Sequence, residues 1–84
     1  MRPNFGSNLR SLVFAPNSRA TANLARHYVE EALTKWEPRI ILDEVNVQNE
    51  RDGDHACLLI AIHYHLKATY EPQSLIYPFY LGQP

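Results

Sequence analysis

The longest amphipathic pattern in the chain, residues 20–36, has the spacing of an α-helix. Its apolar positions form one stripe, which consists of Ala25, Val29, Ala32, Leu33 and Trp36 and is widened by Leu24 and Tyr28. Asn17 or Ser18 is suited to cap the first turn, because each side chain can accept a hydrogen bond from a free backbone N–H. Pro38 disfavours the helical conformation of the residue before it, so we expect the helix to end at Glu37.

Three segments after Pro38 have the period of two that is typical of β-strands. In the first, residues 40–47, the apolar positions change from even to odd numbers, so we expect a bulge near Asp43-Glu44. The second, residues 56–69, alternates between an apolar face and a face that is polar in its second half. The third, residues 75–81, contains Pro78, which cannot donate a ladder hydrogen bond and therefore indicates an edge strand.

Short polar connections between these segments predict an antiparallel meander. We expect a polar loop at residues 48–54, with its turn at Asp52-Gly53-Asp54, and a second turn at residues 70–74. Before the helix, Leu9 and Leu12 have helical spacing after turn residues, which indicates a short N-terminal helix or turn. The predicted fold class is α+β, with one long helix packed on a three-stranded antiparallel sheet.

Length and charge limit the function classes. The chain has 84 residues, room for one small domain with part of its stability supplied by a partner. Lys and Arg number 8 against 9 Asp and Glu, so the net charge of −1 argues against a nucleic-acid binder and against attraction to anionic membranes. The longest apolar run, residues 56–62, is too short to span a bilayer, and the N-terminus lacks an apolar signal stretch. We therefore expect synthesis in the cytoplasm.

His63 and His65 are the candidate metal ligands. Alternate strand positions place the two imidazoles on one face about 7 Å apart, but a zinc site needs a third or fourth ligand. Cys57, the single cysteine, is six residues from His63 along the same strand, about 20 Å away. It also opens an apolar run, where burial raises a thiol pKa and leaves it inert. A small metal-binding module stays an alternative, while we expect no metal and no cofactor.

A pair of carboxylates would suffice for glycoside hydrolysis. The candidates are Glu37, Asp43, Glu44 and Glu71. The acid of such a pair needs a raised pKa from a buried apolar cleft, whereas Arg39, two residues from Glu37, would lower the pKa of Glu37. A peptidoglycan hydrolase that uses Glu37 with another carboxylate is the alternative function.

The corner Trp36-Glu37-Pro38-Arg39 places an aromatic ring, an acid and a guanidinium between the helix and the first strand. Pro38 fixes one backbone angle, so the flanking charges project in defined directions. Arg39 can make a two-bond contact with a partner's carboxylate, as interface arginines do. The equal alternative is a local Glu37–Arg39 surface pair, which would contribute about 0–1 kcal/mol.

The sequence resembles the small baseplate wedge protein of contractile-tailed phages, a family also found in type VI secretion, R-type pyocins and extracellular contractile injection particles. The resemblance rests on residues 2–9 (RPNFGSNL), Phe14, Pro16, residues 36–40 (WEPRI) and residues 75–81 (LIYPFYL). It implies that residues 1–84 form a single wedge domain without the N-terminal segment that family members carry.

The resemblance implies structural work and no enzymatic activity. Trp36, Glu37, Pro38 and Arg39 would contact the helical core bundle of the larger wedge proteins. The sheet would template the first sheath ring by strand pairing, at the edge of residues 40–48 or at that of residues 75–81. On the second edge, the pairing residues would be Leu75, Ile76, Tyr77, Phe79 and Tyr80.

The family's place in the particle follows from the same resemblance. Six copies would surround the tube, one in each wedge, with the sheath subunit and the tube subunit as further partners and without nucleic acid or membrane. The chain would be assembled into the baseplate of a phage tail or injection particle. Which of these particles it serves, and which sheet edge pairs with the sheath, stay open at this point.

Overall fold

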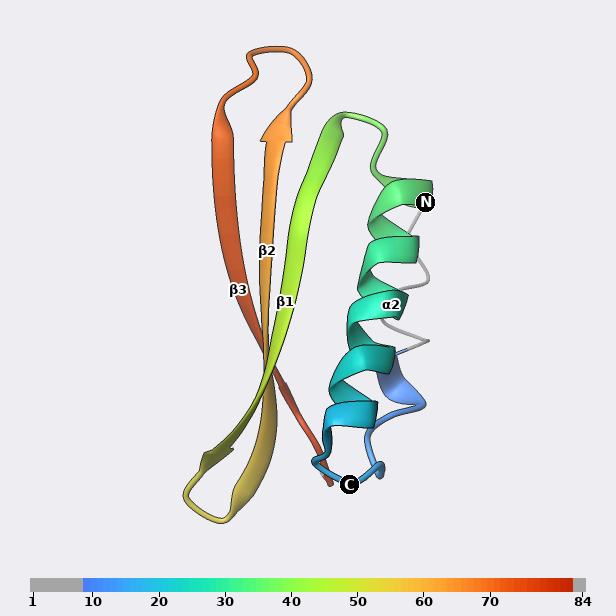
Figure 1. Cartoon of the computed structure of the whole chain (residues 1–84), viewed down its shortest axis with the longest axis vertical. Helices are drawn as coiled ribbons and strands as arrows, with labels where there is room; N and C mark the ends of the chain where they lie inside the picture. The colour runs from blue at the N-terminus through green and yellow to red at the C-terminus, as the bar shows by residue number, and fades with distance from the viewer. Residues whose placement is uncertain (1–8, 83–84) are drawn as a thin grey trace.

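The structure, a computed structural model, describes residues 9–82 apart from the side chain of Trp36. Helix α2 (Arg19–Trp36) is followed by strands β1 (Ile40–Asp52), β2 (His55–Leu66) and β3 (Pro72–Tyr80). The strands form one antiparallel sheet in the order β1-β2-β3, with α2 beside β1 (Figure 1). The α+β class and the three-stranded antiparallel meander predicted from the sequence are therefore confirmed.

Both ends of α2 are set by the residues that the sequence indicated. The Ser18 hydroxyl accepts a hydrogen bond from the Thr21 N–H at 3.3 Å, and the Glu37 N–H donates to the Leu33 carbonyl at 3.1 Å. The buried stripe of the helix contains Ala22, Ala25, Val29 and Ala32. Leu24, expected to widen this stripe, is 41% exposed, because it lies roughly 100° around the helix from Ala25.

The predicted bulge in β1 is present. Leu42 is opposite Tyr64 and Glu44 is opposite His63, so Asp43 is the extra residue. Leu42 and Val45 both face the core, and Val45 is only 3% exposed. In a regular strand an even-numbered and an odd-numbered residue would lie on opposite faces, so the extra residue at the bulge is what brings the two to the same face.

The loop predicted at residues 48–54 is wrong in extent. β1 continues to Asp52, and only Gly53 and Asp54 separate it from β2. Gly53 has a φ of +65°, which glycine adopts readily. Polar side chains are compatible with a strand here because pairing with residues 55–59 of β2 uses backbone groups, and side-chain patterns do not report those groups.

The second turn also differs from its predicted place. β2 ends at Leu66 and β3 begins at Pro72, so the turn spans residues 67–71 instead of 70–74. The Tyr70 N–H donates to the Leu66 carbonyl at 2.7 Å, and the Leu66 N–H donates to the Glu71 carbonyl at 3.2 Å. These two bonds close the turn before Pro72 is reached.

The core lies between α2, the segment before it and one face of the sheet. Its buried residues are Leu9, Leu12, Ala22, Ala25, Val29, Val45, Leu58, Ile60, Ile62 and Leu81. Leu9 and Arg10 are helical and residues 11–14 form turns, while the rest of the predicted N-terminal helix or turn lies outside the described residues. Gly82 donates its N–H to the Val13 carbonyl, which ties the end of the described chain to its beginning.

Replacement of a core side chain on the central strand should be the costly substitution. We expect Ile60→Ala, at a position with 0% exposure, to lower the free energy of unfolding by about 2–5 kcal/mol in urea titrations. The matched variant Ile76→Ala, at a position with 65% exposure, should change the free energy of unfolding by no more than about 0.5 kcal/mol at low protein concentration. Equal losses in the two variants would contradict this assignment of the core.

Candidate partner-binding surfaces

The corner between α2 and β1 is exposed and held by backbone hydrogen bonds. Glu37, Pro38 and Arg39 are all exposed, whereas the side chain of Trp36 lies outside the described residues. The Ile40 N–H donates to the Glu37 carbonyl at 3.4 Å, and the Lys67 N–H donates to the Arg39 carbonyl at 3.0 Å. The second bond ties the corner to the turn between β2 and β3.

The charges of the corner are not paired with each other. Among the described residues, the ion pairs are Arg26–Glu30 at 3.3 Å and His65–Asp43 at 3.0 Å, and neither includes Glu37 or Arg39. The local Glu37–Arg39 pair considered from the sequence is therefore not formed. Both side chains are available to groups outside this part of the chain.

Two shallow grooves meet at this corner and share Arg39 and Leu66. One, of about 330 Å³, is lined by Leu33, Glu37, Arg39, Ile40, Ile62, Tyr64, Leu66 and Leu75. The other, of about 500 Å³, is lined by Arg39, Leu66, Lys67 and Ala68. Lys67 was not a candidate from the sequence, because it is 28 positions from Arg39 and only the β2–β3 turn brings it there.

The second surface is β3, which has β2 on one side and no strand of the described residues on the other. Four of its large apolar or aromatic side chains are exposed: Leu75 at 53%, Ile76 at 65%, Tyr77 at 40% and Tyr80 at 39%. Phe79 is half-buried against the core. The strand PQSLIYPFY carries no charged residue, although edge strands commonly use charge to prevent pairing with other chains.

The backbone direction along β3 can be fixed from the two ends of its ladder. The Leu66 N–H bonds to the Glu71 carbonyl, and the Leu81 N–H bonds to the Ala56 carbonyl, both in the register of the strand pair. Since bonded and non-bonded pairs alternate in an antiparallel ladder, odd-numbered residues of β3 direct their backbone groups to β2. Ser74, Ile76, Pro78 and Tyr80 direct theirs to the open edge, so the nitrogen of Pro78 points away from β2.

The opposite edge of the sheet, β1, is more restricted. The Ile40 N–H is bonded to Glu37 at the corner, and near the other end of β1 the Asn49 side chain donates to the Asn17 side chain and to the Ser18 carbonyl, each at 2.9 Å. The bulge at Asp43 further interrupts the regular ladder geometry between these two points. Of the two edges considered from the sequence, β3 is therefore the one whose pairing with β2 has no bulge.

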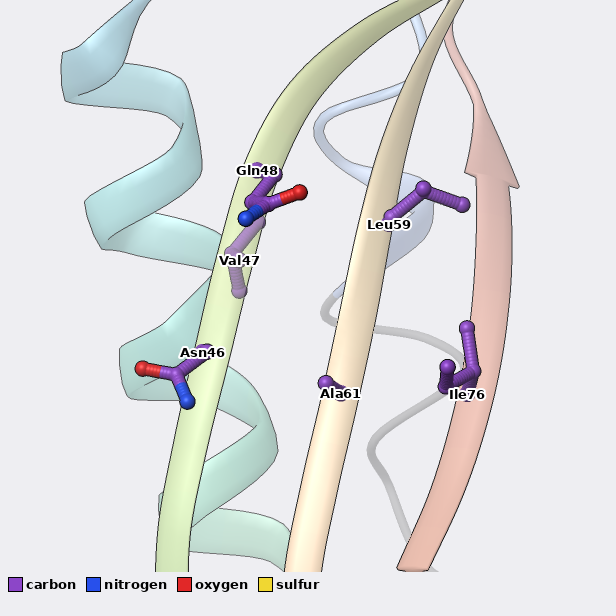
Figure 2. A pocket seen from close by; sticks show the side chains of 6 residues that line it. All are labelled: Asn46, Val47, Gln48, Leu59, Ala61 and Ile76. Atoms are coloured by element: carbon purple, nitrogen blue, oxygen red, sulfur yellow. The ribbon is translucent and has the colours of Figure 1, made fainter.

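The face of the sheet turned away from α2 is open and carries a concavity of about 520 Å³. Figure 2 shows its lining residues on all three strands: Asn46, Val47 and Gln48 on β1, Leu59 and Ala61 on β2, and Ile76 on β3. The amides of Asn46 and Gln48 lie at one side and the apolar Ile76 at the other. This concavity joins the open face to the β3 edge.

The two histidines of the sequence-based metal hypothesis lie on this open face and have other partners. His65 Nδ1 is 3.0 Å from both carboxylate oxygens of Asp43, and His63 Nδ1 is 3.2 Å from the Ser74 hydroxyl. The bulge is what brings Asp43 beside His65. Within residues 9–82, no three or more His, Cys, Asp or Glu side chains are grouped so that they could hold a metal ion.

Two groups near the end of β3 titrate away from their ordinary values. Burial raises the pKa of the Cys57 thiol. A hydrogen bond with the backbone of Phe79 lowers this pKa by a smaller amount, and the negative charges of Asp52 and Glu50 raise it. The negative charge of Asp52 raises the pKa of Tyr80, whose hydroxyl donates to an Asp52 oxygen at 3.4 Å. Neither shift favours a reactive nucleophile, because each group stays neutral to higher pH.

The carboxylates of the hydrolase hypothesis are dispersed over the surface. Glu37, Asp43, Glu44 and Glu71 are all exposed. A glycosidase acid needs an apolar enclosure that raises its pKa, and none of these four exposed side chains is enclosed in this way.

In the described part of the chain, no helix is both long and apolar enough to span a membrane.

Comparison with known proteins gives matches to a family model and to solved structures. Residues 1–71 match the sequence model of a family described as baseplate wedge protein gp25. The fold is similar to the crystal structure of a Geobacter sulfurreducens protein named as a candidate tail lysozyme, with 36% sequence identity and a TM-score of 0.77, over 90% of this chain and 68% of that one. A search of curated protein sequences found no match. The family resemblance inferred from the sequence is thereby confirmed.

The buried environment of Cys57 predicts that its thiol is alkylated slowly and that the rate depends on pH. We expect iodoacetamide to alkylate native Cys57 at least about tenfold more slowly at pH 8 than an exposed cysteine placed at position 74 (Ser74→Cys in a Cys57→Ala background), as followed by mass spectrometry. Because its pKa is raised above the ordinary 9.0, the rate should keep rising as the pH passes 9.0. Equal rates for the two cysteines at pH 8 would contradict the burial of Cys57.

Proposed function

The chain belongs to the family of the baseplate wedge protein gp25, and from this premise we propose that it joins the baseplate wedge to the contractile sheath. Membership of the family makes it a structural component of a phage-tail baseplate, which assembles with other baseplate components. The family match over residues 1–71 is the observation that carries the proposal. The corner and the β3 edge are suited to the two contacts.

The corner Glu37-Pro38-Arg39 is the proposed contact to the helical core bundle of the larger wedge proteins, with Trp36 as part of the same motif. Its two charges project from a rigid proline turn and are not neutralised by each other. Arg39 can therefore bind a carboxylate of the bundle through two hydrogen bonds, and Glu37 can accept from a basic group. Lys67 lies in the same groove and adds a second cation to the contact.

The β3 edge is the proposed contact to the sheath subunit. Its open N–H and C=O groups can add an extended segment of another chain, which gives affinity through backbone bonds. The exposed side chains of Leu75, Ile76 and Tyr77 would cover the added strand on both faces of the sheet. Six copies around the tube would then present six such edges on which the first sheath ring is laid, close to the tube subunit.

We assign no reaction to the chain, although its solved relative is named as a candidate tail lysozyme. That name describes the relative and not this chain. In this chain the alternative of a peptidoglycan hydrolase would need Glu37 to act as an acid, and Glu37 is exposed at the rim of a shallow groove. Solvent exposure supplies none of the desolvation that raises the pKa of a catalytic carboxyl group.

Loss of the Arg39 guanidinium should weaken the wedge contact without unfolding the domain. In particles that carry Arg39→Ala, we expect electron microscopy to show bare tubes or loose sheath without an attached baseplate, because a buried partner carboxylate would lose its two-bond contact. The matched control Arg26→Ala removes an exposed arginine from α2, 44% exposed and paired locally with Glu30, and should leave assembly normal.

Circular dichroism of the purified Arg39→Ala protein separates a contact from a structural role. The far-ultraviolet spectrum and thermal unfolding should match those of the wild-type protein, since the Arg39 side chain has no ion pair among the described residues. An unfolded variant, or normal contractile particles, would contradict the proposed wedge contact.

Removal of an outward N–H from β3 should block the sheath contact. Ser74→Pro deletes one N–H on the open edge and no ladder bond to β2, so we expect assembled baseplates on tubes without sheath in electron micrographs. Ser74→Ala is the control, because it loses the hydrogen bond with His63 but keeps the N–H, and it should assemble normal sheath. Normal sheath on the Ser74→Pro baseplates would place sheath pairing elsewhere.

A further inference from the structure

We propose that, free in solution, two copies of this chain pair through their β3 edges into a weak antiparallel dimer. Figure 1 shows the first part of β3 at the side of the sheet away from α2, while the end of the strand runs toward the start of the helix. In the sheet order β1-β2-β3, the free side of β3 faces away from β1. The inference goes beyond the proposed function and depends on the β3 edge alone, whether or not that edge also receives the sheath.

The backbone of the β3 edge is complementary to itself in one central register. Its open N–H donors belong to Ser74, Ile76 and Tyr80, while Pro72 and Pro78 offer only a carbonyl there. When Ile76 faces the second copy's Ile76, the two residues exchange a pair of hydrogen bonds. In the same register, the Ser74 N–H meets the carbonyl of Pro78 and the Tyr80 N–H meets that of Pro72. Every open donor thus finds an acceptor, whereas the carbonyls of Ser74 and Tyr80 face a proline nitrogen and receive no hydrogen bond in the pair.

The side chains fit the same register on both faces of the sheet. On the open face, Ile76 packs against its counterpart beside the concavity that it lines in Figure 2. On the opposite face, Leu75 of each copy lies across from Tyr77 of the other, an aliphatic–aromatic pair of the kind that stabilises antiparallel strands. Because residues 72–80 contain no charge, the two copies bring no like charges together.

The size of the contact makes the dimer weak. One strand of 9 residues on each copy buries much less than the roughly 1,200 Å² typical of stable protein–protein interfaces. The resulting six-stranded sheet is still within the ordinary range of about 4–6 strands. At high protein concentration such a weak dimer covers the exposed apolar β3 edge. A partner strand that makes further contacts would displace the second copy from this edge.

Sedimentation equilibrium of the full chain over a range of protein concentrations tests the proposal. The apparent mass should rise from 9.7 kDa toward about twice that value between roughly 1 µM and 1 mM. Ile76→Lys, which brings two like charges together at the centre of the pair, should stay monomeric over the whole range. Leu24→Lys places the same charge at a position of α2 that is 41% exposed, and it should dimerise like the wild-type chain.

Cysteine cross-linking tests the register. Under mild oxidation, Ile76→Cys should give a disulfide-linked dimer, because facing residues of a bonded antiparallel pair have Cα atoms about 5.5 Å apart. Leu24→Cys should stay monomeric under the same conditions. A wild-type chain that is monomeric at every concentration, or dimerisation abolished by Leu24→Lys and retained in Ile76→Lys, would overturn the proposal. Circular dichroism of each variant confirms that it is folded.

Discussion

A single helix is too narrow to cover a three-stranded sheet, and the other features of this domain follow from that limit. A helix with its side chains is about 10 Å across, while three strands with their flanking side chains are wider. Because α2 lies beside β1, the core forms at the β1 and β2 half of one face. The β3 half is left with exposed Leu75 and Tyr77, and the opposite face is left open. The proposed sheath contact and the proposed dimer contact both use these uncovered parts of the sheet.

Two local devices adapt the sheet to this arrangement. The bulge at Asp43 brings Leu42 and Val45 to the same face and, as a consequence, sets the Asp43 carboxylate beside His65 on the other. The bond from Lys67 to the Arg39 carbonyl closes the end of the sheet against the corner. The charged motif is therefore held on a fixed frame, and its side chains are left without local partners among the described residues.

The uncharged β3 edge has a cost and a use. An exposed apolar edge promotes pairing with other chains, and natural proteins usually prevent this with charge. Here Pro78 moderates the edge, because its nitrogen points outward and breaks the row of donors without disturbing the ladder to β2. A template for another strand requires such an open edge, and a small domain obtains part of its stability when a partner covers it.

The features that the sequence determined by itself are those fixed by neighbours along the chain. Ser18 and Pro38 set the ends of the helix through local backbone chemistry, and the change of parity between Leu42 and Val45 required a bulge. Tertiary structure decided the rest: polar residues 48–52 remain in β1 because β2 supplies their backbone partners, Leu24 is exposed because the sheet lies on the other side of α2, and Lys67 joins Arg39 only across a turn. The outward direction of the Pro78 nitrogen likewise depends on the pairing register of β3 with β2. A register is a relation between two strands, so the sequence of β3 alone does not determine it.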